Sequence, residues 1–365
     1  MKPGGRNEVL DRAAAVCILT LCFGCLHVIA LKSQLFTRLG GLPSSTEFPI
    51  NYKTLYFDQK FLEPWQPQHQ YGSSPDMVPC GDFYKIVTQD FARSGHNCDA
   101  NIRKSWKAIN NVTSTASGLQ WLSEEFSLCA PLKSAMDVAI FKNWLQETWV
   151  NLAMVDYPYE ANFLQPLPPW PIQVVCKYLG FDSTVSDYQL LHGVSQAAKV
   201  YYNYTGSSSC LNISQTATGS LGLLGWFYQA CTEMVMPMCT DGVQDMFEPE
   251  EWNFQAFSDE CNAIFGVRPR ADWAGIVYGG KDIIAHSNII FSNGGLDPWS
   301  AGGVTYNITD SLISIMIPDG AHHLDLRYSN DNDPPSVRAA RAVEVKYFRE
   351  WINHAPKTPR TAPTP

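Results

Sequence analysis

The sequence is short of positive charge. Its 26 Lys and Arg residues face 35 Asp and Glu residues, which gives the 365-residue chain a formal net charge of −9. Nucleic-acid phosphates bind to basic surfaces, so this balance argues against a nucleic-acid partner. An acidic surface suits an acidic compartment, but many cytosolic proteins are acidic too. Charge alone therefore does not fix the compartment.

The sequence also lacks metal-binding spacings and internal repeats. Beyond residue 31, no cysteine has the paired CxxC or Cys/His spacing of a zinc site, and we expect neither a metal nor a cofactor. Eight cysteines remain in that part of the chain. An even number in an exported protein indicates four disulfides, although spacing leaves the pairing open. The eight are Cys80, Cys98, Cys129, Cys176, Cys210, Cys231, Cys239 and Cys261.

The N-terminal segment has the pattern of an export signal. Three basic residues, Lys2, Arg6 and Arg12, precede an apolar run over residues 13–31. If the run is not cleaved, it is long enough to anchor the chain in a membrane; if it is cleaved, we expect no stable membrane span. Four glycosylation sequons agree with export, at Asn111, Asn203, Asn212 and Asn307. The sequence therefore predicts entry into the secretory pathway.

Periodicity divides the rest of the chain. Residues 52–57 (YKTLYF) alternate like a short strand, and a Pro-, Gln- and Ser-rich connection follows. Helical spacing dominates residues 82–202, as in the stripes Ile102, Trp106, Ile109 and Val138, Phe141, Leu145, Trp149. The prolines of residues 166–171 end one helix before another begins near residue 172.

The last third changes character. Residues 287–293 (SNIIFSN) and 312–317 (LISIMI) predict two short buried strands, each followed by a glycine-containing turn. A final helix is expected after Asp333, with Pro334 in its first turn. Its predicted buried face consists of Ala340, Val343, Tyr347 and Trp351. The Pro- and Thr-rich tail is expected to be disordered.

Each of these two strands is followed by a residue suited to acid–base chemistry. Asp297 lies in FSNGGLDPWS, and His322 and His323 lie in DGAHHLDL. Catalytic groups of α/β sheets gather at the carboxyl ends of strands, and Asp followed by His is the order that ends an α/β-hydrolase Ser–Asp–His triad. Taken alone, an Asp-Pro turn and a structural loop histidine are the commoner explanation of these residues.

Longer stretches carry a family resemblance. Residues 147–171 (ETWVNLAMVDYPYEANFLQPLPPWP), 201–239, 291–304 (FSNGGLDPWSAGGV) and 320–327 (GAHHLDLR) resemble the lysosomal Pro-X carboxypeptidase, or prolylcarboxypeptidase, family of serine peptidases. The similarity runs from about residue 78 to residue 351, with a trace at residues 52–60. The sister family, dipeptidyl-peptidase II, shares AHHLDLR, but LPPWP and DPWS fit the carboxypeptidases better.

The resemblance implies an α/β fold. We expect an α/β-hydrolase-like domain, here with an incomplete sheet, and an inserted, mainly helical domain. The implied order is a signal peptide or anchor (1–31), a remnant of the N-terminal hydrolase half with a divergent linker (46–79), the helical insert (80–202), the C-terminal part of the hydrolase domain (203–353) and the tail (354–365).

The resemblance also implies an activity and a location. Family members remove a C-terminal residue that follows proline, so the full-length form would act on peptides with a penultimate proline, in the lysosome or after secretion. A homodimer is also expected. Dipeptidyl-peptidase activity remains an alternative that substrate profiling would separate.

By position, the resemblance assigns Asp297 as the triad carboxylate and His322 as the general base, with His323 as a structural neighbour. Trp299 and Met236 match residues near the proline-binding pocket, although ordinary core packing explains them almost as well. The implied disulfides are Cys80–Cys239, Cys98–Cys176, Cys129–Cys210 and Cys231–Cys261.

The chain departs from the family at the nucleophile. The family motif G-G-S-Y-G-G is absent, and no G-x-S-x-G occurs anywhere in the sequence. T-G-S-L-G around Ser220 lacks the first glycine, while Ser73 and Ser74 lie in the divergent linker without a preceding strand. We therefore predict little or no peptidase activity for this chain. The alternative is a non-catalytic interaction protein of the secretory pathway.

Overall fold

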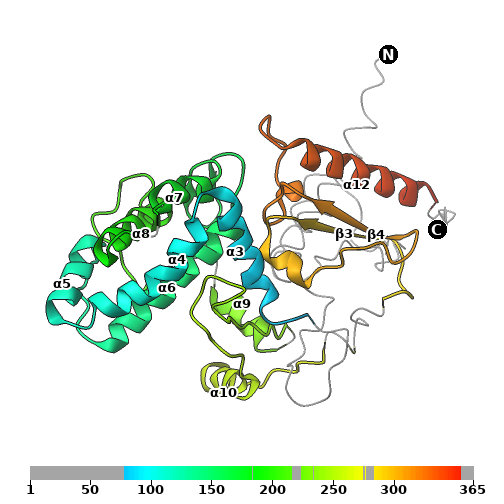
Figure 1. Cartoon of the computed structure of the whole chain (residues 1–365). Helices are drawn as coiled ribbons and strands as arrows, with labels where there is room; N and C mark the ends of the chain where they lie inside the picture. The colour runs from blue at the N-terminus through cyan, green and yellow to red at the C-terminus, as the bar shows by residue number, and fades with distance from the viewer. Residues whose placement is uncertain are drawn as a thin grey trace, which may run out of the picture.

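A computed structural model of the chain describes residues 78–182, 184–215, 223–232, 234–273, 276 and 283–354. Residues 82–202 form a body of helices, and residues 283–354 form a smaller body around two strands (Figure 1). The helices of the first body are α3 (Asp82–Ser94), α4 (Cys98–Val112), α5 (Ala116–Glu125), α6 (Ala135–Met154), α7 (Pro171–Leu179) and α8 (Asp187–Tyr202).

Local sequence explains where several of these helices begin. Ser134 and Asp137 form a capping box at the start of α6, and Ser186 and Gln189 form one at the start of α8. Proline occupies the first position of α7, where its missing N–H costs nothing. Between α6 and α7 lies a small antiparallel hairpin, β1 (Ala161–Asn162) with β2 (Pro166–Leu167), which periodicity did not predict.

The predicted helix stripes form the core of this body. Ile102, Trp106 and Ile109 on α4 are at most 4% exposed, and all four residues of the stripe on α6 are buried. Phe141 of α6 contacts Phe126 edge to face, with ring centroids 4.8 Å apart. The aromatic spacing thus marked packing surfaces, which is what helical periodicity predicts.

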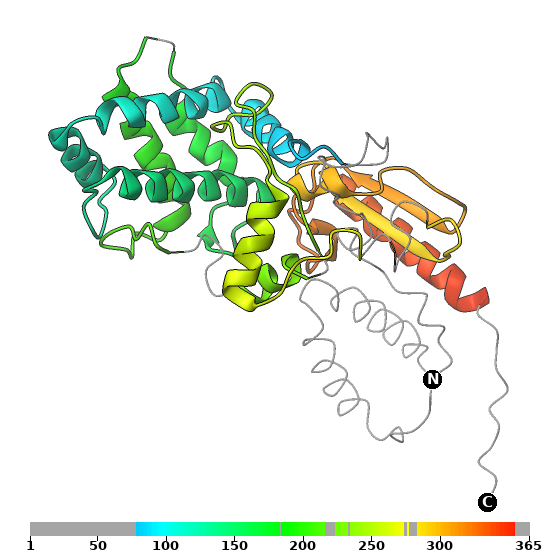
Figure 2. The same cartoon turned by 90° about the horizontal axis from the view of Figure 1, so that it is seen from below.

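The second body is built on one parallel strand pair. Strand β3 (Ile289–Gly294) pairs with β4 (Leu312–Ile317) in parallel, with Ile289 opposite Leu312. The short 3-10 helices η2 (Pro298–Gly302) and η3 (Leu324–Leu326) follow the two strands, and α12 (Pro335–His354) packs along the pair (Figure 2). Helices α9 (Leu223–Ala230) and α10 (Phe254–Phe265) lie between the two bodies in sequence. Small sheets in a helix-rich chain agree with an α/β-hydrolase-like fold bearing a helical insert.

Four disulfides link these elements, in the pairs that the resemblance implied. Cys80–Cys239 joins the residues before α3 to the segment after α9 across 159 positions. The other three are Cys98–Cys176 between α4 and α7, Cys129–Cys210 after α5 and α8, and Cys231–Cys261 between α9 and α10. Crosslinks over such separations restrict the unfolded chain and so favour the folded one.

The prediction for the buried face of α12 was partly wrong. The helix buries Val337, Ala340 and Glu344, whereas Val343 is 39% exposed. Tyr347 and Trp351 are half-buried. Position 344 instead lies on the buried face, with the Asp325 carboxyl group of η3 as its neighbour. An apolar stripe read from sequence could not anticipate a buried glutamate.

Several predicted features lie outside the described residues: the export signal, the strand at residues 52–57 and the tail. Within the described ranges, no helix combines the length and apolar character needed to cross a membrane.

Candidate active site

Asp297 and His322 lie against each other at the carboxyl ends of β3 and β4. The distance from Asp297 Oδ2 to His322 Nδ1 is 2.8 Å, and the two residues are 7% and 8% exposed. Asp297 follows β3 as the N-cap of η2, and His322 follows β4. The two residues expected from the resemblance to work together are therefore adjacent.

Glycines allow the two loops to meet. A Cβ atom on Gly294 would lie 2.3 Å from the carbonyl oxygen of Gly320, so no larger residue fits without movement. The backbone N–H of Leu296 donates to that same carbonyl at 2.9 Å, and the N–H of Gly295 donates to the carbonyl of Ile317 at 2.8 Å. These contacts set the separation between the Asp297 loop and the His322 loop.

The carboxylate of Asp297 is fixed on both oxygens. Oδ1 accepts the backbone N–H of Trp299 at 3.1 Å, while Oδ2 faces Nδ1 of His322. A carboxylate only accepts, so Nδ1 carries the proton and Nε2 is the basic nitrogen of the neutral ring. This is the tautomer that a general base requires for taking a proton from a hydroxyl nucleophile.

The helical body holds the backbone of His322. Its N–H donates to the carbonyl of Met154 at 3.0 Å, and its carbonyl accepts the hydroxyl of Tyr157 at 3.0 Å. Met154 is the last residue of α6, and Tyr157 lies just beyond it. The position of the imidazole therefore depends on contacts between the two bodies.

His323, the expected structural neighbour, lies beside the pair. Its backbone adopts φ +42° as the N-cap of η3, and its ring centroid is 3.9 Å from that of His322. The ring of Phe163 meets it edge to face at 5.6 Å. The sharp turn lets successive histidines point into the same region.

Trp299 packs at the junction of the two bodies. Its ring centroid lies 4.9 Å from Phe83 and 5.8 Å from Trp226, and its indole N–H donates to the sulfur of Met154 at 3.3 Å. Met236 is half-buried in the segment between α9 and α10. The structure thus places Trp299 next to Asp297, while the expected role of Met236 stays a prediction.

Two further buried carboxyls, Asp90 and Asp156, act on each other, and Asp297 acts on Asp90; both escaped the sequence analysis. Asp90 on α3 is 1% exposed, and neither carboxyl oxygen has a hydrogen-bond partner among the described residues. Burial, with repulsion from Asp156 and more weakly from Asp297, raises the pKa of Asp90 to about 9. Burial also raises the pKa of Asp156 to about 7, although it accepts the N–H of Ile172 at 3.1 Å. In its protonated form, Asp90 adds no negative charge beside Asp297.

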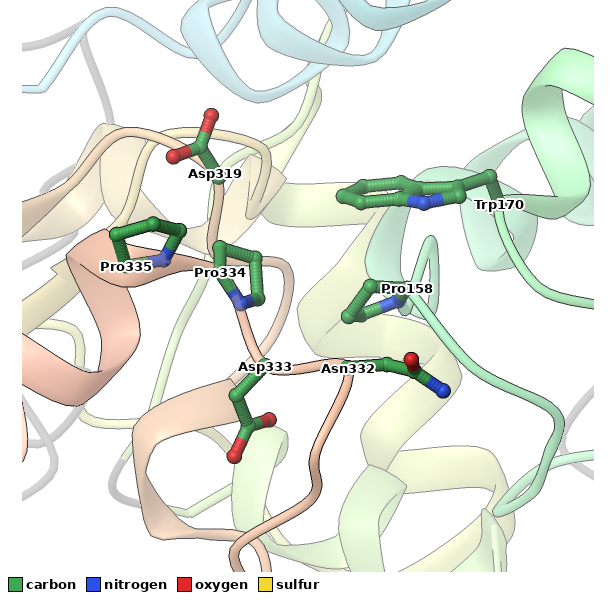
Figure 3. A pocket seen from close by; sticks show the side chains of 7 residues that line it. All are labelled: Pro158, Trp170, Asp319, Asn332, Asp333, Pro334 and Pro335. Atoms are coloured by element: carbon green, nitrogen blue, oxygen red, sulfur yellow. The ribbon is translucent and has the colours of Figure 1, made fainter.

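A separate hollow of about 500 Å³ lies between Trp170 and Pro158 on one side and Asp319 and Pro334 on the other (Figure 3). It is lined by Pro158, Trp170, Asp319, Asn332, Asp333, Pro334 and Pro335. The backbone N–H of Trp170 donates to the carbonyl of Tyr157, whose hydroxyl binds His322. Neither Asp297 nor His322 belongs to this lining.

Of the remaining residues that the sequence singled out, the structure describes some and leaves others outside its described ranges. Ser73, Ser74 and Ser220 lie outside the described residues. Of the sequons, Asn111, Asn212 and Asn307 are exposed and Asn203 is half-buried. No cluster of three or more potential metal ligands occurs in the part of the chain that the structure describes.

Comparison with known proteins identifies the family. A model of the family described as serine carboxypeptidase S28 matches residues 74–344. Lysosomal Pro-X carboxypeptidases of Bos taurus and Homo sapiens are each 60% identical, over 278 and 277 residues. Prolyl carboxy peptidase like protein 5 of Caenorhabditis elegans is 35% identical over 286 residues.

The aligned part covers 76% of this chain in the first two comparisons and 73% in the third. It covers 56%, 55% and 56% of the respective relatives, so the chain spans little more than half their length. The match to the family model extends over the strand pair, Asp297 and His322. The chain belongs to the serine carboxypeptidase S28 family.

Proposed function

We propose that this chain carries the Asp–His half of a Pro-X carboxypeptidase catalytic triad, in a form with little or no peptidase activity of its own. Asp297 is the triad carboxylate and His322 the general base. The observation that supports these roles is the 2.8 Å contact between Oδ2 and Nδ1 of two buried residues at neighbouring strand ends.

The reaction class follows from the relatives. Proteins named Pro-X carboxypeptidase share 60% of the aligned positions, so the full-length form is proposed to release a C-terminal residue that follows proline. Trp299 and Met236 are proposed to line the site for the proline ring. A flat, half-buried indole beside the triad suits a pyrrolidine, because both present rigid apolar faces.

The proposed lack of activity rests on the sequence. The given sequence contains no G-x-S-x-G motif. Loss of a triad member costs roughly 10⁴- to 10⁶-fold in turnover, and loss of an oxyanion-hole donor costs about 10²- to 10³-fold.

A fluorophosphonate probe tests this proposal, because it reacts with activated serines. We expect the purified chain to remain unlabelled, while a full-length family member in the same experiment is labelled. Stoichiometric labelling of this chain would disprove the proposed incompetence. Mapping the labelled residue would then show whether Ser73, Ser74 or Ser220 serves as nucleophile.

The proposed location is the lysosome or the secreted space, with a cleaved signal and glycans on Asn111, Asn203, Asn212 and Asn307. The relatives are named lysosomal, and several buried carboxyls have raised pKa values that favour folding in acid. Glycosidase treatment of the exported chain would reveal the glycans as a mass change.

A non-catalytic role remains the second candidate, supported by the missing nucleophile motif and the preserved helical body. In that role residues 80–202 would pair with full-length subunits, or two copies would form a homodimer. Size-exclusion chromatography of the chain with and without the full-length enzyme would separate the two roles. Co-elution without labelling would favour pairing.

A further inference from the structure

Glu344 is the most unusual side chain of α12. It occupies the buried face of the helix, with Val337 and Ala340, and is 2% exposed. Its Oε1 atom has no hydrogen-bond partner among the described residues. A buried carboxyl group is costly to keep ionised, so its surroundings must explain its protonation state.

The neighbour of Glu344 is a second carboxyl group. Asp325 lies in η3, three positions after His322, and is 6% exposed. The two carboxyl groups lie within hydrogen-bonding reach of each other. Asp325 Oδ2 also accepts the hydroxyl of Ser292 from β3 at 2.7 Å. One hydrogen-bond network therefore joins α12, η3 and β3.

The nearby cation does not neutralise this pair by direct contact. Arg341 Nη1 donates to Asp333 Oδ2, while Nε donates to the carbonyl of Asp325 at 2.7 Å and Nη2 to those of Leu324 and Arg327. These bonds fix the backbone of η3, and within the described residues neither carboxyl group of the pair forms an ion pair with a lysine or arginine. Two desolvated carboxyls in hydrogen-bond contact cannot both be ionised.

We propose that Glu344 and Asp325 form a proton-dependent clamp that fastens α12 to the loop carrying His322, with the shared proton held by Glu344. In acid the proton bonds the two carboxyl groups. As pH rises and the proton leaves, two buried negative charges face each other, and η3 is pushed away from α12. The clamp positions His322 and contacts neither the substrate nor the reacting atoms.

The titration of the pair agrees with this arrangement. Burial first, and then repulsion between the two groups, raises the pKa of Glu344, and burial raises the pKa of Asp325. Arg341 opposes these effects and is the remaining charged neighbour of both groups. Because the folded pKa of Glu344 lies above its unfolded value, the folded chain holds an extra proton between those two values. Stability therefore falls with rising pH in that window.

The test follows thermal or urea unfolding of the whole chain from pH 5 to pH 9 for wild type and Glu344→Gln. The glutamine amide still donates to Asp325 but cannot ionise. We expect equal stability at pH 5 and greater stability of the variant at pH 8. One titrating proton changes the unfolding equilibrium constant by about tenfold per pH unit. The unfolding constant of the variant should therefore change with pH by up to about tenfold less per pH unit than that of wild type.

Glu350→Gln is the matched control, because Glu350 lies on the same helix with a side chain 46% exposed. It should leave the pH dependence at the wild-type value. Hydrogen exchange of residues 320–327 gives a second measurement: protection should fall with pH in wild type and persist in Glu344→Gln. An unchanged pH slope and unchanged exchange in Glu344→Gln would overturn the clamp.

A measurement on wild type keeps the proposal testable if the variant does not fold. Carboxyl ¹³C NMR of the glutamate-labelled chain, with the Glu344 signal assigned, should show this carboxyl still protonated at pH 7, and an ionised Glu344 would refute the proposal. None of these measurements requires peptidase activity. Either proposal, the clamp or the function proposed above, can therefore be disproved without disproving the other.

Discussion

The hydroxyl of Tyr157 donates to the carbonyl oxygen of His322 at 3.0 Å, across 165 positions of sequence. Tyr157 is 1% exposed and belongs to the segment that leaves the helical body after α6. The backbone N–H of His322 is held from the same segment by the carbonyl of Met154. The candidate base is thus positioned by the helical body as much as by the strand that precedes it.

Tyr157→Phe should destabilise the chain and loosen the His322 loop. The substitution keeps the ring and removes the donor, which leaves a buried carbonyl without this partner. A loss of about 1–3 kcal/mol in the free energy of unfolding is expected. Urea unfolding measures the loss, and hydrogen exchange of residues 320–324 locates it. Tyr306→Phe, at a residue 64% exposed, is the control and should be neutral; equal effects of the two substitutions would contradict this role of Tyr157.

Gly294→Ala should separate the two halves of the candidate site. The added Cβ would lie 2.3 Å from the carbonyl oxygen of Gly320, so the loops after β3 and β4 must move apart. Overpacking of this kind costs about 1–3 kcal/mol. Thermal unfolding measures the cost, and a shift of the His322 imidazole resonances would report the displacement.

Gly225→Ala provides the comparison, because a Cβ at that position on α9 meets nothing within 4 Å. Alanine is the better helix former by roughly 0.5–1 kcal/mol, so this variant should be neutral or more stable. If Gly294→Ala behaved in the same way, the close approach of the loops would not constrain the site.

The sequence predicted the parts of the fold that obey a simple period. The run LISIMI is β4, residue for residue, and the stripe Ile102, Trp106, Ile109 is buried on α4. The adjacency of Asp297 and His322 was also expected, because parallel neighbouring strands present their carboxyl ends at one edge. Such features depend on local pattern or on strand order, and both are visible in sequence.

The buried carboxyls were not predictable in the same way. Glu344 lies four and seven positions from Ala340 and Val337, on the face that an apolar pattern would fill with hydrophobic residues. Its burial depends on Asp325, which another element supplies. Asp90 did leave a signal, since Val87 and Phe91 place it on the inner face of α3. Polar residues at such positions deserve to be considered when helical stripes are assigned.

Asp90→Asn should make the chain less sensitive to alkaline pH. Burial and repulsion from Asp156 raise the pKa of Asp90 to about 9, so the folded chain keeps a proton that the unfolded chain releases near pH 4. The stability that this bound proton contributes is complete below about pH 4 and is lost progressively as pH rises toward 9. Asparagine mimics the protonated acid and should flatten this decline. Thermal unfolding between pH 5 and pH 9 tests the effect, with the exposed residue change Asp310→Asn as control. If the stability of Asp90→Asn fell with pH as steeply as that of wild type, Asp90 would be ionised in the folded state.

Asp297→Asn should change which nitrogen of His322 carries the proton. In wild type, Oδ2 can only accept, so Nδ1 is the donor of the 2.8 Å bond. An asparagine amide can present its NH₂ group to Nδ1 and so favour the Nε2–H tautomer, in which Nδ1 accepts. ¹⁵N NMR of histidine-labelled chain distinguishes the two tautomers without any need for turnover. We expect Nδ1–H in wild type and a population shift toward Nε2–H in the variant.

If wild type already had the proton on Nε2, the imidazole could not act as the base for a hydroxyl nucleophile, and the assignment of the Asp–His pair would be wrong.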